Sequence, residues 1–488
     1  MRVLALLALL MTASARAADA PPLYALLVGG GPDQANNAAQ IEGHVHFVGS
    51  ILPPETRRKV LFADGKTNGA KVCFLDKTAD ATARQALGVL LPKDDALNAP
   101  DLRPLQLGLP VDGSAGAKTI HAAIGKLTAE AAAKPAPVLL YFAGHGSSSS
   151  DAGTPAYDMW DDKELDVHAL ARELARLPAS ARVTLVMAQC YSGAFGNVLF
   201  TGGSEKGALA RTNLAGFFSA APDREASGCS WETGETDYQD FSSYFFGALT
   251  GRDRFGHAVT GADYDGDGRV TLHEAFCYAL AHDISIDTPV CTSEVFLRRE
   301  VKLDDDKIFG VPYTQVAAES TPAQRAVLEA LSQRLGLTGD DRALTVYDKL
   351  EFADQVARNP ELDTQNTTGE QLDALRLGTL ETLFKNWPDL RWNDSDKYDD
   401  AVKGAQKSLA QNPALCRSLL ETAHASDLAS GAVDDEEADL MRFRMLYAAI
   451  VRAAELKAHG TKSDVAHFES IWQAEQQTLP LVAVPEAK

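Results

Sequence analysis

The chain has 488 residues, and 46 Lys and Arg against 67 Asp and Glu give a formal net charge of −21 with neutral histidines. A field this negative repels phosphates, and no basic block interrupts it, so a nucleic-acid-binding role is not expected. Hydrophobic residues make up 45% of the chain and charged residues 23%, which excludes collagen, coiled coil and bulk disorder. At roughly 150 residues per domain, two to three domains are expected.

The first twenty residues have the pattern of a secretory signal peptide. Arg2 precedes the apolar run from Val3 to Met11, and small residues then offer cleavage sites after Ala17 or Ala20. The run is too short to span a bilayer, and no later stretch reaches the roughly 18 to 20 apolar residues that a transmembrane helix needs. We therefore expect a secreted or periplasmic protein with no membrane span. An uncleaved anchor is the alternative.

Six cysteines are too few for a disulfide-built scaffold, although export would permit bridges. They contain no Cys-x-x-Cys pair, so a zinc knuckle is not expected. If Cys190 is a free thiol, at least one further cysteine is unpaired. Cys229, Cys277 and Cys291 are the pool for a bridge, and the sequence leaves the pairing open.

Residues 21–305 alternate short apolar runs with helical periods, which is typical of βαβ units. Strands that are apolar throughout are buried on both faces, so we expect an α/β fold with a mostly parallel sheet between helical layers. Gly29-Gly30-Gly31 fits no phosphate-binding motif and is interpreted as a turn into a helix. The expected strands are 24–28, 60–63, 138–142, 183–187 and 214–219, and the expected helices include 35–51, 120–127, 167–177 and 241–249.

After residue 305 the strand signals stop and helical periods take over. Thr321 and Pro322 have the cap and first-turn pattern, and Gly336 has the pattern of a helix stop. We therefore predict a separate all-α C-terminal domain over residues 306–488, which offers a surface for a protein partner. Its later helices are expected over 372–384, 401–410, 414–424 and 434–456.

Two expected strand ends carry reactive side chains. His145 follows the strand 138–142, and Cys190 follows the strand 183–187. One helix lies between these strands, and a right-handed crossover makes them neighbours, so His145 and Cys190 should emerge side by side. An imidazole can take the proton of a thiol and leave a nucleophilic thiolate. An inert core thiol and a turn histidine are the alternative for each residue taken singly.

The residues around this pair are small. Gly144, Gly146 and Gly193 let a substrate backbone approach, and they leave amide groups free to hold an oxyanion. The turn Gly144-His145-Gly146 and the turn Ala188-Gln189-Cys190-Tyr191-Ser192-Gly193 resemble the catalytic turns of the caspase and legumain group of cysteine peptidases.

This resemblance extends over residues 23 to 300 and implies a caspase-like three-layer sandwich that cleaves protein or peptide substrates. It implies that His145 acts as general base and acid and that Cys190 attacks the peptide carbonyl. It also implies that the amides of Gly146 and Cys190 form the oxyanion hole. The helical domain lies outside the resemblance.

The segment after the strand 214–219 resembles the lining of the primary specificity pocket in that group. Two positions before the nucleophile, where relatives often carry an acidic residue or glutamine, this chain has Ala188, so substrate preference does not transfer. Nearby acids and the net charge favour Arg or Lys at the P1 position, and the alternative is that these acids only solvate a loop. Candidate pocket residues are Ala188, Gln189, Asp223, Trp231 and Glu232, with Asp237 as a further acid.

Residues 263–274 match the twelve-residue EF-hand calcium loop at each diagnostic position. A helix is expected to follow from Leu272, but none precedes the loop directly, so a lone structural Ca²⁺ site of about 10⁻⁴ to 10⁻³ M is expected. A solvated acidic turn is the alternative, and no organic cofactor is indicated. The expected ligands are Asp263, Asp265, Asp267, the Arg269 carbonyl, Thr271 through water, and Glu274.

The sequence thus predicts a secreted cysteine endopeptidase that calcium supports structurally. Two alternatives stay open. One is a catalytically inactive caspase-like module that binds calcium and a partner protein. The other is a transpeptidase or ligase, in which an amine resolves the intermediate formed by the same dyad.

Overall fold

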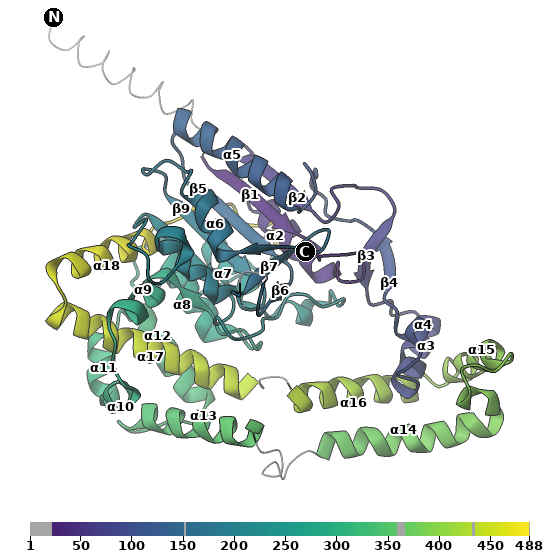
Figure 1. Cartoon of the computed structure of the whole chain (residues 1–488). Helices are drawn as coiled ribbons and strands as arrows, with labels where there is room; N and C mark the ends of the chain where they lie inside the picture. The colour runs from purple at the N-terminus through teal and green to yellow at the C-terminus, as the bar shows by residue number, and fades with distance from the viewer. Residues whose placement is uncertain (1–21, 151–152, 359–366, 432–434, 488) are drawn as a thin grey trace, which may run out of the picture. The chain divides into compact units, whose positions relative to one another are not determined.

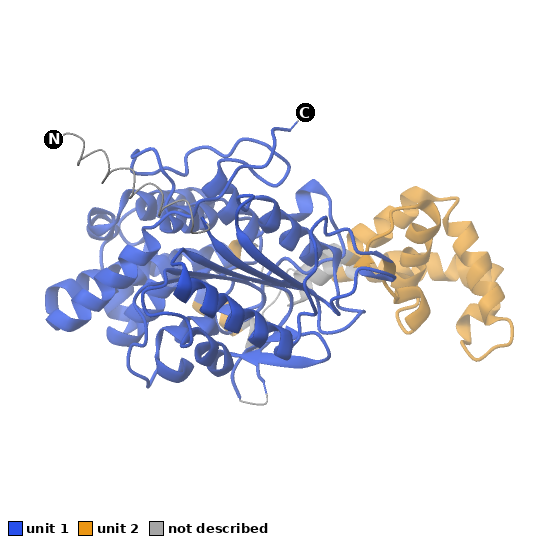
Figure 2. Cartoon of the chain, turned by 90° about the horizontal axis from the view of Figure 1, so that it is seen from above, with its two compact units in different colours: residues 1–72, 103–350, 438–488 blue, residues 73–102, 351–437 orange. Residues whose placement is uncertain are grey.

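The computed structural model describes residues 22–150, 153–358, 367–431 and 435–487. They form two compact units, coloured separately in Figure 2. Unit 1 draws on residues 1–72, 103–350 and 438–488, and unit 2 draws on residues 73–102 and 351–437. The division therefore does not follow the boundary near residue 305 that the sequence suggests. The expected signal peptide, residues 1–20, lies outside the described residues.

A six-stranded sheet forms the centre of unit 1, in the order β11-β10-β9-β5-β1-β2 (Figure 1). Four of its five parallel strands are buried along their whole length, as expected for a sheet that helices cover on both faces. The expected α/β class with a mostly parallel sheet is confirmed. The parallel strands are β1 (Tyr24–Gly29), β2 (Arg57–Phe62), β5 (Val138–Ala143), β9 (Val183–Ala188) and β10 (Leu214–Phe218), and β11 (Val290–Cys291) runs antiparallel to β10.

Alternate residues of each strand point to opposite faces and enter two separate cores. In β1, Ala25 and Leu27 belong to one core, and Leu26 and Val28 belong to the other. The first core is covered by α2 (Ala39–Ser50), α7 (Phe241–Thr250) and α8 (Leu272–His282), and the second by α5 (Ala117–Ala133), α6 (Val167–Leu174) and α9 (Thr292–Glu300).

The last helices of the chain are part of unit 1 because they share these cores. Phe443 and Tyr447 of α17 are buried with the residues of α7 and α8. Glu475 of α18 is fully buried at the start of α9, where it accepts hydrogen bonds from Thr292 Oγ1 and from the Ser293 amide, both at 2.7 Å. The helices concerned are α10 (Asp305–Phe309), α11 (Tyr313–Glu319), α12 (Pro322–Arg334), the part of α13 (Arg342–Arg358) up to Leu350, α17 (Asp435–His459) from Ala438, and α18 (Lys462–Glu475).

Unit 2 is a helical module with its own apolar core, to which Leu87, Leu383 and Leu419 contribute. The sequence predicts helices after residue 305, but not that residues 73–102 join them. The two segments belong together because they share an apolar core, and no local sequence pattern indicates this. The helices are α3 (Ala79–Leu90), α4 (Asp95–Asn98), α14 (Thr367–Asn386), α15 (Tyr398–Leu409) and α16 (Pro413–Gly431).

Two small sheets accompany the central sheet. β3 (Ala70–Phe74) pairs with β4 (Asp101–Pro104), and an antiparallel sheet of β6 (Gly146–Ser147), β7 (Ala156–Met159) and β8 (Lys163–Asp166) follows β5 directly. Among the described residues, no helix combines the length and the apolarity needed to cross a bilayer.

Candidate active site

The carboxyl ends of β5 and β9 lie side by side and in register. Ala143, the last residue of β5, pairs with Ala188, the last residue of β9. His145 and Cys190 each stand two residues beyond this paired position, on the same edge of the sheet. The expected proximity of these two strand ends is therefore present in the fold.

The two turns touch through their backbones. A Cβ added at Gly146 would lie 2.2 Å from the carbonyl oxygen of Cys190, a distance that side-chain atoms do not tolerate. Gly144 is similarly restricted, because a Cβ there would lie 2.8 Å from the carbonyl oxygen of Gly30. Glycine on both sides of His145 lets this turn lie against its neighbours.

A third turn holds the imidazole. Nε2 of His145 lies 2.9 Å from the carbonyl oxygen of Asn36, in the turn that follows β1. A carbonyl only accepts hydrogen bonds, so this contact assigns the proton to Nε2 and leaves Nδ1 as the basic nitrogen. His145 is half-buried, and its own carbonyl accepts the amide of Asp158 at 3.0 Å.

Asn36 lies where the sequence predicts a helix, since residues 35–51 were expected to be helical. The helix α2 begins only at Ala39. Asp33 explains the delay, because its side chain accepts the Asn36 amide at 2.9 Å and so offers the backbone a turn in place of a helix. The preceding glycines contribute, because a Cβ at Gly31 would lie 2.1 Å from the Asn36 oxygen.

The chain segment Arg224–Ser230 lies against the half-buried Cys190, and Ala226 of this covering segment contacts the thiol. Sγ accepts the amide of Ala226 at 3.3 Å and lies 3.7 Å from the Ala226 carbonyl oxygen. Burial raises the pKa of Cys190 to about 12, and the charges of Glu225 and Asp287 act in the same direction. In this conformation the thiol is protonated at neutral pH.

The backbone immediately after Cys190 is strained. Tyr191 has a φ of 59°, in the left-handed region that non-glycine residues seldom adopt. Its amide donates to the Arg224 carbonyl at 2.7 Å, which ties the turn to the covering segment. Strain of this kind is often found at functional sites because the surrounding fold must hold it in place.

Two amides remain for an oxyanion. The hydrogen bond from Asp158 N to His145 O makes Gly146 and Tyr157 a non-hydrogen-bonded pair of the β6–β7 ladder, so the Gly146 amide points away from β7. Outside helices and strands, no backbone hydrogen bond of the described residues involves the Cys190 amide as donor. The expectation for Gly193 is wrong, because its amide donates to the Ala220 carbonyl at 2.8 Å.

The expected pocket residues differ in their exposure. Ala188 is 7% exposed within the first core, and Gln189 is 1% exposed, so neither presents its side chain to solvent. The Gln189 side chain lies beside Gly146, and within the described part of the chain neither of its polar atoms has a hydrogen-bond partner. Asp223 and Trp231 are exposed, and Glu232 is half-buried.

The carboxyl groups whose charges act on Cys190 are Glu225 and Asp287, neither of which the sequence predicts as a site residue. Glu225 stands within the expected pocket segment, two residues after Asp223, so its position was a usable signal. Asp287 lies 97 positions after Cys190 in the chain and carries no local motif.

The acidic loop 263–274 is shaped by its own carboxylates. Asp263 Oδ1 accepts the amide of Gly266 at 2.8 Å, and Oδ2 accepts that of Gly268 at 2.9 Å. Both glycines have positive φ, 74° and 83°, which the sharp turn requires. The oxygen atoms of Asp263, Asp265 and Asp267 lie within 4.8 Å of one another, a donor set that suits a hard cation.

The remaining expected ligands are less well placed. Glu274 lies outside this group of three carboxylates. Its Oε1 accepts the Tyr264 amide at 2.9 Å, and its Oε2 accepts the Thr271 amide at 3.0 Å, so Glu274 and Thr271 form a capping box at the start of α8. The Arg269 side chain forms an exposed ion pair with Asp267 at 2.7 Å. Bidentate ligation by Glu274 would require it to release its backbone partners.

Comparison of the chain with models of protein families finds no match, and no curated protein matches it. These comparisons therefore assign neither a family nor an activity.

Proposed function

We propose that the protein is a cysteine endopeptidase of caspase-like fold, exported from the cytoplasm, in which Cys190 is the nucleophile and His145 the general base and acid. One observation carries the proposal. The His145 turn and the Cys190 turn end neighbouring parallel strands in register, and they touch at Gly146. Reactive groups at the carboxyl edge of a parallel sheet are the usual arrangement of an active site in this class of fold.

In the proposed reaction, His145 takes the proton of the Cys190 thiol, and the thiolate attacks the carbonyl carbon of a peptide bond to form a C–S bond. The amides of Gly146 and Cys190 hold the resulting oxyanion. His145 then gives its proton to the leaving amine as the C–N bond breaks. Water, deprotonated by His145, hydrolyses the thioester and releases the acid and the thiol.

The Asn36 carbonyl supports this assignment of roles. An imidazole that donates from Nε2 to a fixed carbonyl keeps one ring orientation and leaves Nδ1 to receive the proton of the thiol. The high pKa of Cys190 implies that the free enzyme holds a neutral thiol, and that the thiolate forms as the substrate is bound.

Charge near the nucleophile bears on the substrate. The carboxylate of Glu225 stands near Cys190, and the net charge of −21 gives the whole molecule a negative field. Asp287 contributes less, because burial and the neighbouring Asp283 raise its pKa well above the ordinary value. We therefore keep Arg or Lys as the expected P1 residue of a protein or peptide substrate.

Calcium has a structural role in this proposal. The oxygens of Asp263, Asp265 and Asp267, with the Arg269 carbonyl, would hold the ion and neutralise three neighbouring carboxylates. The loop leads into α8, whose Phe276 packs against Phe217 of β10 at 5.7 Å between ring centroids. The ion would thus stabilise a helix that supports the central sheet.

The proposal is tested with a fluorogenic peptide library varied at P1. Cys190→Ala and His145→Ala should each abolish turnover while the unfolding temperature stays unchanged. The matched control is Cys229→Ala, because Cys229 is half-buried and its thiol is influenced by the same acids, Glu225 and Asp287. This variant should retain most of the wild-type turnover, and activity that survives in Cys190→Ala would contradict the assignment.

The alternatives give different results in the same assay. Mass spectrometry of the products separates hydrolysis from ligation to an added amine. If wild type and all variants are inactive at every P1 residue, and Cys190 resists peptidyl electrophiles, the inactive calcium-binding module becomes the better interpretation.

A further inference from the structure

The segment Arg224–Ser230, which covers Cys190, is fastened at one point by a buried carboxyl group. The Ser227 amide donates to Asp287 Oδ1 at 2.6 Å. Ser227 directly follows Ala226, whose amide donates to the Cys190 sulfur. Asp287 is 1% exposed and Ser227 is half-buried, so the carboxyl end of this bond lies away from solvent. A hydrogen bond to a buried carboxyl group fixes the peptide position strongly, because its loss would leave a buried carboxyl oxygen without this partner.

Asp287 has a second backbone partner. Its Oδ2 accepts the amide of Phe241, the first residue of α7, at 2.9 Å. One carboxyl group thus joins the covering segment to the start of a helix in the core, and both of its oxygens are used. The hydrogen bond to Asp287 fixes the position of Ser227, and the hydrogen bond to the start of α7 fixes the carboxyl group of Asp287.

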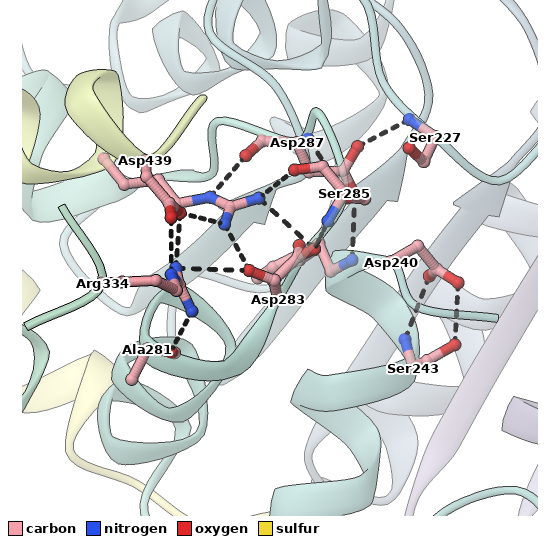
Figure 3. A network of polar contacts seen from close by, with 11 residues as sticks. Ser227, Asp240, Ser243, Ala281, Asp283, Ser285, Asp287, Arg334 and Asp439 are labelled. Atoms are coloured by element: carbon pink, nitrogen blue, oxygen red, sulfur yellow. Dashed lines mark hydrogen bonds and ion pairs between the residues drawn. The ribbon is translucent and has the colours of Figure 1, made fainter. Parts of the chain in front are cut away.

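The turn that carries Asp287 is itself held from α17 (Figure 3). Arg442, whose side chain is fully buried, donates from Nε to the Asp287 carbonyl at 2.7 Å and from Nη2 to the Ser285 carbonyl at 2.6 Å. It also pairs with Asp283 at 3.3 Å. A planar guanidinium whose N–H groups bond to several carbonyls of one short turn restricts the conformation of that turn.

Asp439 and Arg334 complete the outer side of this network. Asp439 accepts from Arg442 Nη1 at 3.0 Å and pairs with Arg334. No hydrogen bond or ion pair of Asp439 among those known for the described residues reaches the covering segment. Asp439 is therefore a member of the same buried network without a bond to the segment.

We propose that Asp287 is a positioning residue, which sets how the segment Arg224–Ser230 lies on the sulfur of Cys190. Through the Ser227 amide it keeps the Ala226 peptide in contact with the thiol. The kinetic part of this inference rests on the proposed peptidase function, whereas the accessibility of the thiol does not.

The direction of the effect follows from what acts on the thiol. Burial is the largest influence on Cys190, the amide of Ala226 partly offsets it, and the charges of Glu225 and Asp287 act in the same direction as burial. Loss of the Asp287 charge therefore favours the thiolate as well, and the comparison of Asp287→Ala with Asp287→Asn, which both lack this charge, isolates the release of the segment. A segment released from Asp287 would expose the sulfur to water, and a better-hydrated thiol forms its thiolate more readily. Alkylation of Cys190 should then become faster, while its orientation for catalysis becomes poorer.

The test is the rate at which iodoacetamide alkylates Cys190, followed by peptide mass spectrometry at one pH and well below the unfolding temperature. Asp287→Ala should raise this rate at least about three-fold, because it removes both acceptor oxygens. Asp287→Asn keeps one acceptor and should give an intermediate rate. If Asp287→Ala does not fold, the comparison of Asp287→Asn with wild type decides.

The matched control is Asp439→Asn, which disturbs the same network and should lower the unfolding temperature without changing the alkylation rate. Equal alkylation rates in wild type and in the Asp287 variants would overturn the proposal. So would an equal acceleration in Asp439→Asn, since the effect would then be one of general loosening.

Peptide turnover supplies the second measurement. Asp287→Ala should lower kcat by about ten-fold or more and change KM less, because a misplaced nucleophile affects the transition state more than binding. If wild type turns over no peptide, the proposed function fails, while the alkylation rates still decide the role of Asp287. If wild type is active and the alkylation rates are equal, only the positioning role fails.

Discussion

The edge of the sheet and the acidic loop 263–274 differ in the sequence separation of the residues that contact one another. In the loop, Asp263 bonds to amides three to five residues later. At the edge, His145 meets a carbonyl 109 positions away, and Ser227 meets Asp287 across 60 positions. The loop can form from local sequence, whereas the edge exists only when the whole of unit 1 has folded.

This contrast implies different consequences of damage. In the proposed mechanism, a change at the edge alters groups that touch the reacting atoms, so it should lower activity with little loss of stability. A change in the loop affects only the local support of α8, so it should lower the unfolding temperature by a few degrees at most. The predictions below separate these two outcomes.

The largest effect is expected for Gly146→Ala. The added methyl group would collide with the Cys190 carbonyl oxygen, so the two turns must separate and the Gly146 amide must leave the oxyanion position. We expect kcat/KM to fall by about 100-fold or more, measured on the best peptide of the library. Gly378→Ala is the control, because a Cβ there meets no atom within 4 Å, and this variant should keep wild-type activity.

The next effect concerns the pH dependence of the free thiol. Since burial raises the pKa of Cys190 to about 12, its thiolate fraction should increase about ten-fold per pH unit from pH 7 to pH 10. The iodoacetamide rate should follow without a plateau, whereas a free cysteine peptide levels off above its pKa of about 8.5. A plateau near pH 7 would instead indicate a thiolate and imidazolium pair that exists before substrate binds.

The smallest effect belongs to calcium. An ion present at ten times its Kd stabilises the fold by about 1.4 kcal/mol, so a chelator should lower the unfolding temperature of a unit of this size by roughly 2 °C. Asp265→Asn should abolish this response, because Asp265 is one of the three clustered carboxylates. Asp304→Asn, at an acid outside the loop, should retain it. If the unfolding temperature of wild type is the same in calcium and in chelator, the proposed structural role of calcium is wrong.

The parts of the fold that the sequence predicts are those with a strong local pattern. Strands β1, β5, β9 and β10 are runs of apolar residues, and each lies within one or two residues of its expected bounds. β2 begins three residues early, at Arg57, where charged residues start the edge strand and mask the pattern. β8 was missed because only one residue of Lys163–Asp166 is buried.

The same limit applies to the site. His145 and Cys190 could be chosen because each follows an apolar strand in a turn of small residues. The Asn36 carbonyl and Asp287 act on them only through the packing of distant segments, and such contacts leave no spacing that a sequence pattern can detect. Glu225 differs, because it stands within the expected pocket segment. The packing of residues 73–102 with residues 351–437 in one unit is likewise a contact between distant segments, so no sequence pattern predicts it.

The most direct test of the central claim is labelling by a peptidyl acyloxymethyl ketone with Arg or Lys at P1, analysed by mass spectrometry. The account predicts a single adduct on Cys190 in the wild-type protein, a greatly reduced yield in His145→Ala, and normal labelling in Cys229→Ala. Equal labelling of Cys190 in wild type and His145→Ala, or an adduct on another cysteine, would contradict the catalytic pair.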